Sequence, residues 1–105
     1  MSKEKAVEIF SEIPRTRNCA QAVAAGFDRD DLIAGLGACG GGRAPEGNCG
    51  ALHAALQLLP AELHGSVKAD FARSAGALRC VEIKANGFPC KECVALAAEL
   101  VEKYR

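Results

Sequence analysis

Cysteine is the residue type in this chain whose placement most directly suggests chemistry. The 105 residues include six cysteines, and three of these stand where we expect a helix to begin: Cys19, Cys49 and Cys90. Asn18 and Asn48 precede two of them as good N-caps, and Pro89 precedes the third and suits a first helical turn. Backbone N–H groups and the helix dipole favour a thiolate at such a position. The pattern therefore predicts that these cysteines are brought together, and that Cys49 is more acidic than a free thiol.

A C-x-x-C motif, Cys90-Lys-Glu-Cys93, occupies the last of these helix starts. This spacing allows a dithiol/disulfide pair, and it also supplies half of the common zinc ligand sets. The alternating strands and helices that surround a thioredoxin-like motif are missing. Cys93 also falls on the apolar stripe of its helix, so a buried core side chain is an equally good interpretation.

Histidine offers a second candidate for chemistry. His53 lies four residues after Cys49, on the same face of the expected helix. The two could be a nucleophile and its base, or two ligands of one metal. We favour the simpler interpretation of a partly exposed histidine. His64 has no cysteine near it in sequence, and we assign it no chemistry.

A glycine-rich stretch, residues 40–47, has the glycine spacing of a phosphate-binding P-loop. It continues with Asn48-Cys49 where that motif needs Lys followed by Ser or Thr, and no strand precedes it. We therefore interpret it as a tight connection between helices.

Composition excludes several classes of function. Lys and Arg number 13, and Asp and Glu also number 13, so there is no electrostatic argument for nucleic acid or an anionic membrane. The first 18 residues are interrupted by charges, unlike a signal peptide, and no stretch reaches the ~20 apolar residues of a membrane span. We expect a cytoplasmic protein, in which six cysteines indicate metal or redox chemistry more than a disulfide scaffold. Buried free cysteines are the alternative.

The elements that must position the cysteines are all predicted to be helices. Apolar residues recur at helical spacing, alanine is abundant, and Pro14, Gly26 and the 40–42 glycines interrupt the pattern. We expect helices over residues 3–13, 18–27, 30–37, 49–59, 60–78 and 89–104. Residues 80–84 are expected to be a short helix or an extended connector. The sequence thus predicts an all-α fold: one domain, residues 1–105, built as a bundle of five or six short helices with a Gly-rich central loop.

The cysteine pattern resembles a known family. Asn18-Cys19-Ala-Gln-Ala-Val, the glycines at 40–42, Cys49-Gly50-Ala51, then Cys80 and Cys90, are similar in order to the C_GCAxxG_C_C family, which is described as redox-active with four characteristic cysteines. The glycine that closes the family's motif is Ala54 here, and Cys39 stands where the family often has an aromatic residue. Cys93 is additional, although it competes with Cys90 for the fourth position.

The resemblance implies that Cys19, Cys49, Cys80 and Cys90 are the catalytic, cofactor-binding and metal-ligating residues. We expect electron transfer through a Cys-ligated metal centre such as an iron–sulfur cluster held by these four thiolates. One alternative has no cofactor: a dithiol/disulfide oxidoreductase or redox sensor. Another is a zinc site in a structural adaptor. The partner would be another redox protein, and a homodimer is left open.

Overall fold

The structure is all-helical, as the sequence predicts. A computed structural model of the chain describes residues 2–11, 17–37 and 47–104. Within these ranges there are seven α-helices and no strand beyond an isolated antiparallel bridge between Asn48 and Arg79. The α-helices are α1 Ser2–Phe10, α2 Cys19–Gly26, α3 Ile33–Leu36, α4 Gly50–Gln57, α5 His64–Ala75, α6 Cys80–Ala85 and α7 Cys90–Tyr104. Two 3-10 helices, η1 Asp30–Leu32 and η3 Ala61–Leu63, lead into α3 and α5.

The number of helices is higher than the five or six expected. Residues 80–84, which we expected to be either a short helix or an extended connector, are helical and belong to α6. The predicted fifth helix begins later than expected, because Pro60 caps η3 and the α-helix starts only at His64. The ends of α7 agree with the prediction to within one residue.

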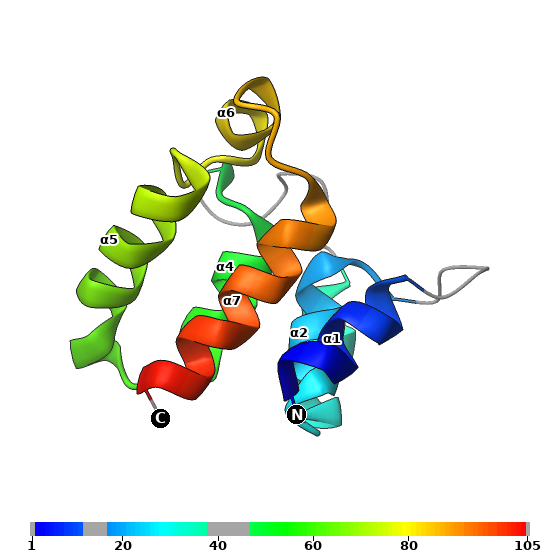
Figure 1. The fold of residues 1–105 in the computed structure, drawn as a ribbon. Coiled ribbons are helices and arrows are strands. Elements are labelled where there is room, and N and C mark those ends of the chain that lie inside the picture. Colours follow the sequence, from blue (N-terminus) through cyan, green and yellow to red (C-terminus); the bar gives the residue numbers. More distant parts are fainter. Residues whose placement is uncertain (1, 12–16, 38–46, 105) are drawn as a thin grey trace.

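Helix α7 is the central element of the bundle. It packs against α1, α2, α4 and α5, and Figure 1 shows it between α5 on one side and α1 with α2 on the other. Its inward face carries the predicted apolar stripe: Cys93, Ala97 and Leu100 are buried, and Tyr104 is half-buried. Cys90 and Cys93, in the first turn of α7, therefore lie at one end of the core.

Small residues let α2 and α4 pack closely against each other. Alanines dominate both helices, and those facing the core have no exposed surface: Ala20, Ala22 and Ala24 in α2, and Ala51, Ala54 and Ala55 in α4. Leu52 and Val23, on the same two helices, are also fully buried. Ala54, which departs from the family pattern, is thus a small residue in a fully buried position, where added bulk would force the helices apart.

Two glycines place α6 over the end of the bundle where α7 begins (Figure 1). Gly76 follows α5 with φ of 87°, and Gly87 follows α6 with φ of 78°, a backbone region that glycine adopts without strain. A Cβ atom at Gly76 would lie 2.6 Å from the Asn86 Nδ2 atom. Asn86 and Gly87 form the turn that follows α6, and this turn sets α6 beside the start of α7.

Some predictions fall on residues that the structure does not describe. These are the end of the first expected helix beyond residue 11, and most of the Gly-rich loop, residues 38–46, with Cys39. Among the helices that are described, none combines the length and the apolar character needed to cross a membrane.

Candidate cysteine site

Five cysteines line a single small cavity at the end of the bundle covered by α6. Cys19, Cys49, Cys80 and Cys90, the four predicted site residues, are joined there by Cys93. The cavity has a volume of about 20 Å³, and Gly50, Ile83, Lys84 and Phe88 complete the lining among the described residues. Cys90 is half-buried, whereas the other four are buried. The prediction that the four cysteines lie together therefore agrees with this geometry.

Cys19 is positioned by a complete capping box. The Asn18 side chain accepts a hydrogen bond of 2.8 Å from the Gln21 N–H, and the Gln21 side chain accepts one of 3.0 Å from the Asn18 N–H. The Asn18 amide also donates to the carbonyls of Leu36 and Gly37, which ties α2 to α3. Asn18 is thus the N-cap that the sequence predicts, and Cys19 is the first residue of α2.

Cys49 is positioned differently, and the predicted N-cap role of Asn48 is wrong. Cys49 itself is the N-cap of α4, and its side chain makes no capping hydrogen bond. Its backbone N–H donates to the Leu78 carbonyl over 2.9 Å, and Asn48 pairs with Arg79 in the isolated bridge. Because Leu78 and Arg79 lead directly into Cys80, this pairing brings Cys49 next to Cys80.

Cys80 and Cys90 are held by the turn between α6 and α7. Cys80 is the first residue of α6, and the Phe88 N–H closes the turn with a bond of 3.2 Å to the Ile83 carbonyl. Pro89 then precedes Cys90, and the Pro89 carbonyl accepts a bond of 3.1 Å from the Cys93 N–H. One short hairpin of helices therefore supplies three of the five thiols.

The buried thiols contact one another in a row. Cys19 pairs with Cys49, and Cys49 pairs with Cys93, through thiol–thiol hydrogen bonding. The bond to Cys49, helped by burial, raises the pKa of Cys19 far above its usual range. The bond from Cys19 acts to lower the pKa of Cys49, but the bond to Cys93 and burial outweigh it, so the pKa of Cys49 is raised to about 12. Burial also raises the pKa of Cys80.

The prediction that Cys49 is more acidic than a free thiol is therefore wrong for the protein in this state. The helix start does aim backbone N–H groups at the thiol, but neighbouring thiols and the loss of water dominate. The protonated form of Cys19, Cys49 and Cys80 is therefore favoured, because burial penalises a thiolate and neighbouring thiolates would repel one another.

The lining of the cavity is rich in thiols and poor in charged side chains. Of the described lining residues only Lys84 is charged, and none is a carboxylate. Helices α2, α4 and α7 all begin at the cavity, so their positive dipole ends would stabilise anionic sulfur. Among the residues that the structure describes, no three His, Cys, Asp or Glu side chains are already arranged to hold a metal ion. The sulfurs would therefore have to draw together as a metal enters.

Both histidines lie apart from this cavity. His53 is half-buried, burial lowers its pKa, and it is not among the lining residues. The His64 Nε2 atom lies 2.7 Å from the Leu56 carbonyl oxygen and 3.0 Å from that of Leu59, so this nitrogen is the protonated donor that caps the C-terminal end of α4. The expectation that His53 is an ordinary histidine agrees with its position.

Cys93 is the lining residue whose role the sequence left open. It is both a buried residue on the apolar stripe of α7 and a member of the cysteine cavity. Its C-x-x-C spacing from Cys90 pointed to this position, since one helical turn brings two such side chains to the same end of a helix.

Comparison with known proteins adds no relative: no family model matches the chain, and no curated protein or solved structure matches it significantly.

Proposed function

We propose that the chain is a small redox-active protein whose cysteine cavity holds a thiolate-ligated metal centre, with an iron–sulfur cluster as the form that carries electrons. The observation that carries this proposal is that four cysteines at four separate helix starts line the same cavity. Cys19, Cys49, Cys80 and Cys90 would be the ligands, and Cys93 would hydrogen-bond to one of them or replace it. Such a centre, when bound, takes up and releases an electron.

The state of the thiols explains why a metal would be favoured there. With raised pKa values, Cys19, Cys49 and Cys80 keep their protons in the metal-free protein. A thiophilic cation compensates the cost of deprotonation, because it neutralises the thiolates that would otherwise repel one another. Ile83 and Phe88 on the cavity wall keep water away, which strengthens these electrostatic interactions.

We further propose that the chain is a relative of the C_GCAxxG_C_C family. The order of the cysteines along the chain supports this proposal, as does their common cavity. The small residue at Ala54, where the family has glycine, keeps α4 close to α2.

The test is metal and sulfide analysis of protein purified without oxygen. We expect brown protein that contains iron and acid-labile sulfide, and at least a tenfold loss of iron in each of Cys19→Ser, Cys49→Ser, Cys80→Ser and Cys90→Ser, as for removal of a metal ligand. His53→Ala is the matched control and should retain the iron. Colourless, metal-free protein that does not take up iron and sulfide during anaerobic reconstitution would contradict the proposal.

A second candidate, thiol/disulfide exchange without metal, is favoured by the contacts from Cys19 to Cys49 and from Cys49 to Cys93. In this reaction a small disulfide RSSR is reduced to two RSH molecules while two protein thiols lose their protons and form one S–S bond. Cys90 is the half-buried thiol that can meet RSSR first. The exchange is tested by mass spectrometry: a metal-free protein should lose two hydrogen atoms and gain one internal disulfide that includes Cys49.

A structural zinc site is the third candidate, and the size of the cavity favours it. About 20 Å³ holds roughly one water-sized occupant without rearrangement. Zinc would make the protein a colourless adaptor, and its loss would lower the free energy of unfolding without any change in redox behaviour. The metal analysis above separates this candidate from the first.

A further inference from the structure

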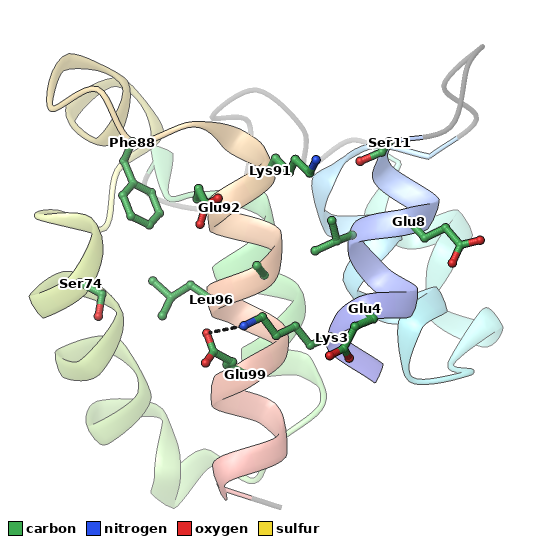
Figure 2. Close-up of a pocket in the computed structure, with 12 residues that line it drawn as sticks. Lys3, Glu4, Glu8, Ser11, Ser74, Phe88, Lys91, Glu92, Leu96 and Glu99 are labelled. Carbon is green, nitrogen blue, oxygen red and sulfur yellow. Dashed lines mark ion pairs between the residues drawn. The ribbon is translucent and has the colours of Figure 1, made fainter. Parts of the chain in front are cut away.

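A second concave surface runs along the outward face of α7. It is an open groove of about 750 Å³, and Figure 2 shows α7 as its floor, with α1 on one side and α5 on the other. Four half-buried apolar residues form the inner surface: Val7, Phe88, Ala95 and Leu96. We call this surface the α7 groove. A groove with an apolar centre between two flanking helices has the shape that accepts a further helix.

The edges of the α7 groove carry a surplus of negative charge. Four glutamates, Glu4, Glu8, Glu92 and Glu99, line it against two lysines, Lys3 and Lys91. Lys3 is engaged with Glu99 over 3.4 Å, drawn as a dashed line in Figure 2. An approaching segment with basic residues at its edges would therefore be attracted, and an acidic one repelled.

The α7 groove ends at the cysteine cavity. Phe88 lines both, and Lys91 and Glu92 of the groove directly follow Cys90. In a complex with a protein bound along α7, the aromatic ring of Phe88 would therefore lie between that protein and the thiols of the cavity. Close approach of this kind is what electron or thiol exchange between two proteins needs.

We propose that the α7 groove is the docking surface for a basic amphipathic helix of the redox partner protein. The redox character of the partner rests on the proposed function above, whereas the preference for a basic helix rests only on the shape and charge of the groove. The stretch from Lys91 to Glu99 spans about 12 Å of helix, so two to three turns of the partner would be engaged.

The test uses two synthetic peptides of ~14 residues, a length at which designed helices begin to be stable. One carries leucines on one face and lysines on the other, and the second has glutamate in place of every lysine. We expect the basic peptide to bind about tenfold or more tightly than the acidic one at low salt, measured by fluorescence anisotropy, and the difference to shrink at about 1 M salt. Equal binding of the two peptides would overturn the proposal.

Matched variants locate the binding. Glu8→Lys with Glu92→Lys should weaken the basic peptide about tenfold, whereas Glu62→Lys with Glu82→Lys, which makes the same charge change at exposed positions outside the groove, should weaken it about twofold or less. Leu96→Ala should weaken binding, and Val81→Ala, at a residue 64% exposed outside the groove, should not. Equal effects of the two charge pairs would rule out this surface.

Two further outcomes are informative. If sedimentation shows a dimer that Leu96→Asp dissociates, the groove is occupied by a second copy of this chain and the proposal is wrong. Metal content measured on the same variants separates the two proposals: failure of peptide binding in metal-loaded protein removes only the docking surface. Selective binding by a protein that holds no metal removes only the metal centre.

Discussion

The dipeptide Asn-Cys occurs at the start of both α2 and α4, and the two copies do different things. At α2, Asn18 caps the helix with a full capping box and Cys19 is the first helical residue. At α4, Asn48 makes a backbone bridge to Arg79, and Cys49 takes the N-cap position without a side-chain cap. The two thiols nevertheless meet. The first helix start is thus stabilised by a local capping box together with bonds to Leu36 and Gly37, whereas the second is held by residues about 30 positions away in the sequence.

This difference has a cost in local helix stability. A thiol is a poor substitute for Asn, Asp or Ser at an N-cap, so α4 begins without the usual stabilisation. The Cys49 side chain instead contacts two other thiols inside the cavity. The helix start without a side-chain cap is thus at the position where Cys49 lines the cysteine cavity.

The first prediction tests the close approach at the start of α4. Gly50 is buried and lines the cysteine cavity, so Gly50→Leu should cut metal content at least tenfold although no ligand is removed. The added bulk costs about 1–3 kcal/mol and separates the thiols. Gly65→Leu is the control, because no atom lies within 4 Å of a Cβ at that position. The idea fails if Gly50→Leu retains its helical circular dichroism and full metal loading.

The second prediction concerns the pH dependence of the metal-free, reduced protein. Folding raises the pKa of Cys49 to about 12. The contribution of the protonated thiol to folding stability is therefore complete below its unfolded pKa of ~8.5, and it is lost as the pH rises towards the folded pKa. The free energy of unfolding should fall by about 2 kcal/mol between pH ~8 and ~10 through this group. Denaturant titrations should show a shallower pH dependence in Cys49→Ala. Parallel curves for the two proteins would show that folding does not raise the pKa of Cys49.

The third prediction compares the two asparagines directly. Asn18→Ala should lower the free energy of unfolding by about 1–2 kcal/mol, because it removes the cap and the bonds to Leu36 and Gly37. Asn48→Ala should change it by less than about 0.5 kcal/mol, since the contribution of Asn48 is a backbone pairing that alanine can also make. Urea denaturation of both variants is the measurement. Equal losses would mean that the two helix starts are alike after all.

The fourth prediction addresses the opposite end of α4. His64→Ala removes the hydrogen bonds to the Leu56 and Leu59 carbonyls and should cost about 1 kcal/mol of stability. Metal content should not change, because this end of the helix is distant from the cysteine cavity. A His64→Ala protein with reduced metal loading would show that the two ends of α4 are coupled.

Sequence reasoning captured the helices well, since they depend on local features. The apolar stripe of α7, Pro89 at its start and the Asn86-Gly87 turn are each legible within a few residues, and all appear in the structure. The Asn18 cap was also predictable, because Gln21 stands three residues later and completes the box. Asn48 has Ala51 at that position, so the sequence did contain a reason to treat the two asparagines differently.

The convergence of the cysteines could be expected from their positions at helix starts and from the family resemblance, but the protonation of the thiols could not. The helix dipole is a local property and favours a thiolate, while burial and the neighbouring sulfurs depend on how α2, α4, α6 and α7 pack. The same packing placed Cys93 among the site residues and formed the α7 groove from three separate helices. Helix starts and turns follow from short-range bonding along the chain, whereas cavities, pKa values and grooves arise only when distant segments exclude water from the space between them.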